Sequence, residues 1–260
     1  MIFHLALVIC QILILQLILK IPRPVAISQM RTFLGMTGYC RQWILGYATI
    51  IKPLQELTKM DTPEPLLWSQ EAEQAFVTIK QALSSAPALG LPDYAQPFIL
   101  FCHERNGFAL AVPTQKHEDK HHPLTYYSTA LDPVATGFPA CLRAVAKAVL
   151  AVQLSESIVL GSPLTVLVPH AVAALLLKSK TQHLSTSRLT KYELILLSSS
   201  HTTLSHCPIL NPASLLSGPQ NGEPHDCVSV TSLLTCPRED LTDMPLQNPD
   251  LIYFVNGSFL

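Results

Sequence analysis

The order of apolar segments between residues 97 and 197 restricts the fold more than any other feature of this chain. Residues 98–102, 108–112 and 124–128 are short apolar runs, and Gly107 marks a turn between the first two, so each predicts a β-strand. Residues 141–154 are apolar and Ala-rich, which indicates a helix, and 164–168 predict a strand. Helices are predicted at 171–178 and 184–197. Three strands followed by helix, strand and helix are typical of a mixed α/β domain.

The preceding part of the chain predicts helices. Residues 28–44 carry a mostly helical apolar pattern, and 46–68 should be irregular apart from one short helix opened by Pro53. Residues 69–84 give the clearest helix, because Ser69 is a good N-cap and the apolar residues recur on one helical face. That face consists of Ala72, Ala75, Phe76, Ile79 and Leu83.

The charge balance excludes some functions. Lys and Arg number 17 and Asp and Glu 18, giving a net charge of −1, which argues against a strongly basic nucleic-acid binder. A hydrophobic content of 48% argues against disorder. No glycine-rich phosphate-binding loop occurs in the sequence, and no small-molecule substrate is expected.

The N-terminal apolar run, residues 2–19, contains only three polar residues. It is just long enough to span a bilayer, and Lys20 and Arg23 follow it. It reads either as a membrane anchor or as an apolar segment that has lost its native neighbours. The seven cysteines are an odd number without a Cys-x-x-Cys pair, which favours a reducing compartment. We therefore expect a cytoplasmic protein, with membrane association through 2–19 as the alternative.

The C-terminal part reads as a Pro-, Ser- and Asp-rich linker that ends in a strand at 251–255. It also collects candidate metal ligands, but their spacing is irregular and prolines intervene, so no metal site and no cofactor are expected. These candidates are His201, His206, Cys207, His225, Cys227 and Cys236.

Three stretches carry a family resemblance. The first is TFLGMTGYCRQWI at 32–44 with KPL at 52–54. The second runs from Trp68 through the helix at 69–84 to Pro97-Phe98, and the third comprises Pro163-Leu164, Pro169-His170-Ala171-Val172 and Asn211-Pro212-Ala213. Together they resemble the Pol polyprotein of gammaretrovirus-like endogenous retroviruses.

The resemblance implies an organisation. Residues 21–90 resemble the helical thumb of reverse transcriptase, and 91–213 its connection domain, which has an RNase H-like mixed α/β fold in this family. Residues 1–20 would be a leader or membrane segment, 214–249 a linker, and 250–260 the truncated start of the RNase H domain.

The resemblance also implies which catalytic groups are absent. The polymerase signature, a Tyr-x-Asp-Asp turn, does not occur in this sequence. The family's first RNase H aspartate falls at Asn256, and an amide is a poor replacement for a carboxylate that holds a divalent cation. Magnesium would be required only by the missing catalytic domains, so we expect neither polymerase nor nuclease activity.

The connection domain does not match an active RNase H site either. The resemblance places His103 where an active relative has an aspartate, although Glu104 follows it. Cys141, Leu142 and Arg143 lie near the expected glutamate, and His170 stands where the next aspartate is missing. His103 and His170 are read as metal ligands or, more commonly, as surface or satisfied histidines.

Nucleic-acid contact is the function that this segment could retain. Arg31, Gly35 and Tyr39 recur every four residues, hence on one helical face, which in related thumbs follows the minor groove of the template–primer. The alternative is that Tyr39 belongs to the core and Arg31 is a solvated charge. Phosphate contacts are further expected from Arg41, Lys52, Lys59 and Lys80.

Three hypotheses follow. The chain is a non-catalytic remnant of reverse transcriptase that binds RNA–DNA hybrid weakly, or a piece that needs the missing domains as partners, or a membrane-anchored interaction protein. The absent acids favour the first.

Overall fold

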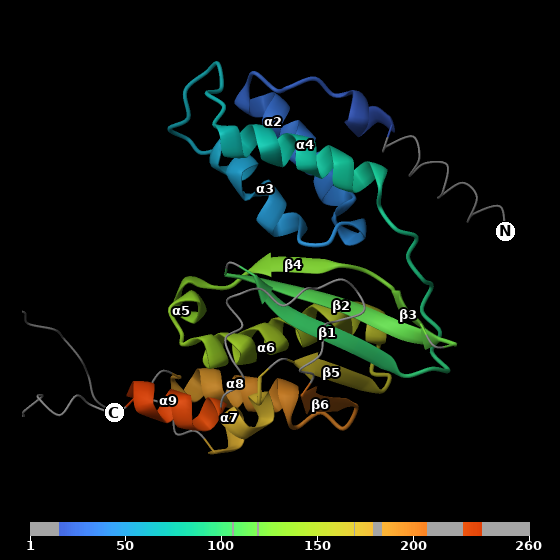
Figure 1. Ribbon diagram of the computed structural model, residues 1–260, viewed down its shortest axis with the longest axis vertical. Coiled ribbons are helices and arrows are strands. Elements are labelled where there is room, and N and C mark those ends of the chain that lie inside the picture. Colours follow the sequence, from blue (N-terminus) through green and yellow to red (C-terminus); the bar gives the residue numbers. More distant parts are fainter. Residues whose placement is uncertain are drawn as a thin grey trace, which may run out of the picture.

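The computed structural model describes residues 16–105, 107–118, 120–168, 170–178, 184–206 and 226–235. Two layers of structure are visible in Figure 1: a group of helices at the top and a sheet with further helices below it. We call residues 16–85 the helical unit, and the described residues from 98 onward the sheet unit. The mixed α/β fold expected from the sequence is confirmed.

The helical unit contains α2 (Ile27–Tyr39), the 3-10 turn η1 (Arg41–Trp43), α3 (Tyr47–Glu56) and α4 (Gln70–Ser84). Helix α4 confirms the prediction at 69–84: the Ser69 hydroxyl accepts a hydrogen bond from the Ala72 N–H at 3.2 Å. All five apolar residues of the predicted face are buried.

Two details of the helical unit differ from the expectation. The helix expected at 28–44 ends at Tyr39 and continues as the short 3-10 turn. Pro53 lies inside α3 rather than at its start, and the helix begins at Tyr47, directly after the N-cap Gly46, whose φ of +69° suits glycine. Packing explains the second difference, since Tyr47, Ile51 and Leu54 of α3 are buried together with residues of α2 and α4.

Aromatic residues form the centre of the helical unit. The Phe33 and Phe76 ring centroids are 4.8 Å apart, and Trp68 meets Phe76 edge-on at 5.5 Å. Ile18 packs into the same cluster and is fully buried. Residues 2–15 of the apolar run lie outside the described residues, and within the described ones no helix is long and apolar enough to cross a bilayer.

One six-stranded sheet organises the sheet unit, in the order β3-β2-β1-β5-β6. β1 pairs antiparallel with β2 and parallel with β5, and β6 extends the sheet in parallel beyond β5. β3 and β4 both pair with β2, at its C-terminal and N-terminal halves respectively, so together they form one edge. The strands are β1 (Phe98–Arg105), β2 (Phe108–His117), β3 (Lys120–Pro123), β4 (Tyr127–Ala130), β5 (Leu164–Val168) and β6 (Thr202–His206).

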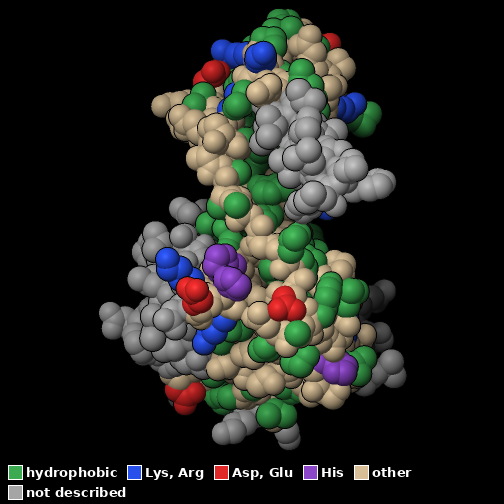
Figure 2. All heavy atoms as spheres, turned by 90° about the vertical axis from the view of Figure 1, so that its right-hand side faces the viewer, with side chains coloured by type: hydrophobic (Ala, Val, Ile, Leu, Met, Phe, Trp, Pro, Cys, Tyr) green, Lys and Arg blue, Asp and Glu red, His purple; other side chains and the backbone are tan. Residues whose placement is uncertain are grey.

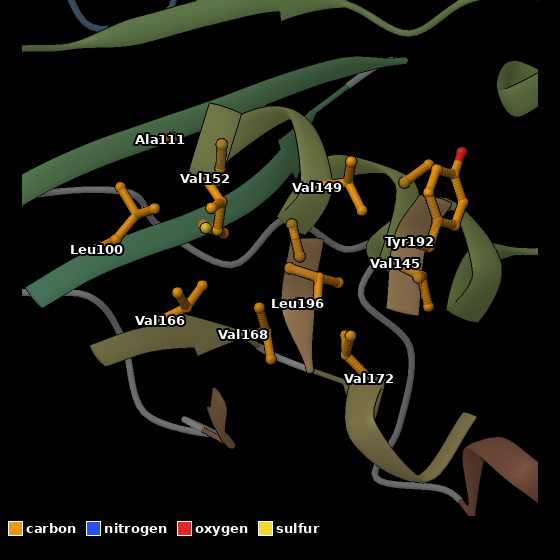
Figure 3. Packing of buried hydrophobic residues seen from close by; sticks show 14 of the residues in the cluster. Leu100, Ala111, Val145, Val149, Val152, Val166, Val168, Val172, Tyr192 and Leu196 are labelled. Carbon is orange, nitrogen blue, oxygen red and sulfur yellow. The ribbon is translucent and has the colours of Figure 1, made fainter. Parts of the chain in front are cut away.

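Helix α6 (Ala140–Val159) is the centre of this unit. It contacts β1, β2 and β5 and also α7, α8 and α9. Figure 3 shows side chains of α6, among them Val145, Val149 and Val152, directed into the cluster with Leu100 of β1 and Val166 of β5. The other helices are α5 (Pro133–Thr136), α7 (Val172–Lys178), α8 (Thr186–Leu196) and α9 (Cys227–Thr235).

Three elements differ from the sequence expectation. Of the strand expected at 124–128, only residues 127 and 128 are in a strand, β4, because 124–126 form the connection from β3 to β4. β6 was not predicted, since TTLSH lacks an apolar alternation. Helix α9 lies inside the segment that reads as a linker, and it packs on α6 and α7. The strand expected at 251–255 lies outside the described residues.

The two units meet at the edge of the sheet, where α3 contacts β4. The Ala48 N–H donates to the Ser128 hydroxyl at 2.8 Å, and the Tyr126 N–H donates to the Gln42 carbonyl at 2.9 Å. Lys52 of α3 lies over the Phe108 ring at 6.0 Å. Figure 2 shows the resulting shape, two lobes joined at a narrower waist.

Candidate nucleic-acid interface

The α2 helix presents Arg31, Gly35 and Tyr39 on one exposed face. Met30, Phe33 and Thr37 occupy the buried side of the same helix. Tyr39 is 59% exposed, so its side chain does not belong to the core. The face that the sequence predicted therefore exists as a surface.

Gly35 leaves the backbone of this face open. A Cβ atom built at Gly35 meets nothing within 4 Å. The glycine is therefore not required by packing within the described residues, although glycine is unfavourable in the middle of a helix. An uncovered helix backbone permits close approach by another molecule.

The two arginines of the candidate face differ in their surroundings. The Arg31 guanidinium donates to the Thr58 carbonyl at 3.1 Å, which ties it to the end of α3. This hydrogen bond fixes the direction of the Arg31 side chain, so Arg31 is not simply a charge surrounded by water. Arg41 is exposed in the 3-10 turn directly after α2.

A shallow hollow of about 290 Å³ adjoins this face and is lined by Leu17, Gly35, Met36 and Tyr39. Its apolar lining and the phenol of Tyr39 suit the sugars or bases of a nucleic acid better than its phosphates. Arg31, four residues before Gly35 on the same helical face, and Arg41, in the turn after α2, would supply positive charge for phosphates.

The lysines expected to add phosphate contacts are mostly engaged elsewhere. Lys80 donates to the Leu19 and Ile21 carbonyls at 3.1 and 2.5 Å, and partial burial lowers its pKa. Lys59 forms an ion pair with Glu56. Lys52 remains exposed beside the sheet unit. On the face in Figure 2 the basic and acidic side chains are scattered rather than gathered into one basic patch.

Among the side chains that the structure describes, the RNase H-like position in the sheet unit holds no set of carboxylates suited to magnesium. His103 of β1 is buried, Cys141 lies in the first turn of α6, and His170 follows β5. The Glu104 side chain and Asn256 lie outside the described parts. Imidazole and thiol are poor ligands for a hard cation, so the residues described here do not fit Mg²⁺.

The candidate metal ligands of the tail do not come together as a group in the described residues. His201 is exposed, with its ring near the Ser200 hydroxyl, and Cys207, His225 and Cys236 lie outside the described ranges, as does the His206 side chain. Cys227 instead lies against His170. Sequence reasoning missed this pairing, because no local spacing connects the two positions.

Comparisons with known proteins agree with the fold. A family model described as the RNase H-like domain found in reverse transcriptase matches residues 68–166. The Gag-Pol polyprotein of feline leukemia virus is 43% identical over 241 residues, which cover 93% of this chain and 14% of that polyprotein. The Gag-Pol polyprotein of baboon endogenous virus (strain M7) is 42% identical over 245 residues, covering 94% of this chain and 14% of the relative.

The Pol polyprotein of feline endogenous virus ECE1 is 40% identical over 245 residues, which cover 94% of this chain and 23% of that polyprotein. The chain therefore spans less than a quarter of these curated relatives.

Solved structures share the fold at low sequence identity. The foamy viral protease–reverse transcriptase in complex with double-stranded DNA has a TM-score of 0.68 at 18% identity, covering 76% of this chain and 35% of that one. The same viral protein in complex with an RNA/DNA hybrid has a TM-score of 0.66 at 18% identity, covering 82% and 29%. The sequence relatives, the family model and the fold agree, and these 260 residues correspond to a segment of a gammaretrovirus-like endogenous retrovirus Pol polyprotein that includes its RNase H-like reverse transcriptase domain.

Proposed function

We propose that this chain is a non-catalytic segment of reverse transcriptase that binds the template–primer duplex weakly. Its helical unit would act as the thumb and its sheet unit as the connection domain. The observation that carries the proposal is the exposed α2 face, where Gly35 leaves the backbone open between Arg31 and Tyr39. The foamy viral proteins of similar fold are complexes with double-stranded DNA and with an RNA/DNA hybrid, which supports a duplex as the ligand.

The chain's own residues support a role without catalysis. No Tyr-x-Asp-Asp turn occurs in the sequence, and the resemblance places Asn256 where the family has its first RNase H aspartate. Two-metal chemistry needs several carboxylate oxygens arranged around both cations. The proposal is therefore limited to binding and does not include strand synthesis or cleavage.

Binding of a fluorescently labelled RNA–DNA hybrid, followed by anisotropy at low and moderate salt, tests the proposal. Tyr39→Ala removes the exposed aromatic side chain that would lie against the sugars of the duplex, so it should weaken binding of the hybrid. Tyr94→Ala is the matched control, because Tyr94 is 52% exposed and its hydroxyl donates to the Ile158 carbonyl of the sheet unit, away from the α2 face. Equal losses for the two variants, or no binding at low salt, would refute the proposed interface.

The role of Arg31 has a separate readout. If its guanidinium contacts a phosphate, Arg31→Ala should reduce the slope of log Kd against log salt by about one. Arg23→Ala is the control, since Arg23 lies in the same unit but pairs with Glu73 at 3.2 Å. An unchanged slope for Arg31→Ala would remove it from the interface.

A further inference from the structure

The sheet unit brings together three soft metal-ligating side chains that are far apart in the sequence. One ligand atom each from Cys141, His170 and Cys227 lies within 4.8 Å of the others. Cys141 belongs to the first turn of α6, His170 follows β5, and Cys227 begins α9. The group thus joins three separate segments at one point.

We propose that Cys141, His170 and Cys227 bind a zinc ion. Zinc takes thiolate and imidazole ligands at roughly 2.3 and 2.0 Å in a tetrahedral arrangement, which places neighbouring ligand atoms about 3.5–3.8 Å apart. The Cys227 Sγ and His170 Nδ1 atoms are 3.5 Å apart, so this pair already has the required separation. Water completes the fourth position in a site with three protein ligands.

The chemistry of the ligands selects the cation. Two thiols and one imidazole favour zinc over magnesium or calcium, which prefer oxygen ligands. The site therefore differs from the magnesium centres of two-metal nucleases in both ligand type and cation, and it adds no nuclease function. A bound ion would connect α9 and the segment after β5 to α6.

The surroundings support a buried ion. Cys141 and Cys227 are 2% and 4% exposed, and the Thr231 side chain, fully buried one turn into α9, donates to the Cys227 carbonyl at 2.7 Å. Burial and the adjacent Cys227 raise the pKa of the Cys141 thiol, so an ion that binds there has to displace its proton.

The start of α9 is held in place by a capping residue. Cys227 is the first residue of α9, and the Asp226 carboxylate accepts hydrogen bonds from the Val228 N–H at 3.0 Å and from the Ser229 hydroxyl at 2.9 Å. This capping fixes the start of the helix, and with it the position of Cys227 beside His170.

The direct test uses the purified full chain, kept reduced with a phosphine and stripped of metal by a chelator. Titration with Zn²⁺ should reach one ion per chain, and Co²⁺ should give a thiolate-to-metal charge-transfer band together with tetrahedral d–d bands. X-ray absorption of the zinc-loaded chain should count two sulfur neighbours and at least one imidazole nitrogen. A zinc ion bound only by oxygen and nitrogen, or no stoichiometric binding, would overturn the proposal.

Variants separate these ligands from the other cysteines. Replacing either sulfur ligand, as Cys141→Ser or Cys227→Ser, should weaken zinc binding by more than the roughly tenfold lost when a supporting residue is removed. Cys40→Ser is the matched control, because Cys40 is likewise a buried cysteine outside any disulfide but lies in the helical unit. Equal weakening by Cys40→Ser would contradict the assignment. The absorption measurement on the unaltered chain decides the matter if a variant fails to fold.

Discussion

Arg188 of α8 and Asp132, which lie 56 residues apart in the sequence, form a two-pronged ion pair. The Arg188 Nη1 atom donates to Oδ2 of Asp132 at 2.9 Å, and Nη2 donates to Oδ1 at 3.2 Å. The Asp132 Oδ1 atom also accepts the Ala135 N–H at 3.0 Å and so caps α5. One carboxylate therefore holds α8 against the start of α5.

Separating the two roles of Asp132 gives a first prediction. Asp132→Asn keeps an oxygen for the cap but loses the ion pair, and the loss should be under about 1 kcal/mol, since the pair is partly exposed to solvent. Asp132→Ala should cost about a further 1 kcal/mol, because the cap is lost as well. Urea unfolding at pH 7 measures both, and similar values for the two variants would contradict the capping role.

The same ion pair predicts a pH dependence. The hydrogen bond from Arg188 lowers the pKa of Asp132, so its contribution to stability is present above the ordinary aspartate range. That contribution should be lost as the pH falls through the lowered pKa. The difference in unfolding free energy between the natural chain and Asp132→Asn should therefore shrink on going from pH 7 to strongly acidic conditions. A difference that grows on acidification would contradict this sign.

Gly35→Ala should change stability and binding in opposite directions. Alanine is favoured over glycine in a helix interior by about 0.5–1 kcal/mol, and a Cβ at this position meets nothing within 4 Å. The variant should therefore be more stable to urea, while the added methyl group should weaken hybrid binding if the duplex approaches the backbone closely. Unchanged hybrid affinity would exclude close approach at Gly35.

The cap of α4 gives a purely structural prediction. Ser69→Ala removes the acceptor for the Ala72 N–H and should lower the unfolding free energy by about 1 kcal/mol. Ser84→Ala is the control, because Ser84 is an exposed residue in the last turn of the same helix. Hybrid binding should be the same for both variants, since neither residue lies on the α2 face.

The purified chain should not cleave RNA in an RNA–DNA hybrid with Mg²⁺ or Mn²⁺, and Asn256→Asp should not change this. One aspartate supplies one ligand, whereas two hard cations need several oxygens. A chimera carrying the rest of a related RNase H domain after Leu260 should become active with Asn256→Asp and remain much weaker with Asn256. Equal activity of the two chimeras would show that position 256 is not the metal-ligand position.

Sequence reasoning succeeded where the determining interactions are local. The Ser69 cap and the apolar period of α4 lie within one helix, and β5 was predicted with its observed bounds, Leu164–Val168. It failed where distant residues decide: Pro53 is accommodated inside α3 because tertiary packing outweighs the lost hydrogen bond. The strand β6 has little apolar signal of its own and is held by its ladder with β5.

The candidate sites show the same difference between local patterns, which the sequence reveals, and contacts between distant residues, which it does not. Spacing every four residues placed Arg31, Gly35 and Tyr39 on one face, but could not decide whether that face is core or surface. The grouping of Cys141 with Cys227 could not be predicted, because these positions are brought together only by the packing of α9 on α6.

The hydrogen bonds between the two units tolerate change in the sequence. Of the four atoms that form the two bonds, three belong to the backbone: the N–H groups of Ala48 and Tyr126 and the carbonyl of Gln42. Every residue type except proline supplies both groups, so most substitutions at these three positions leave them in place. In a genomic copy that accumulates mutations without selection, these backbone hydrogen bonds between the helical unit and the sheet unit would thus persist longer than contacts that depend on particular side chains.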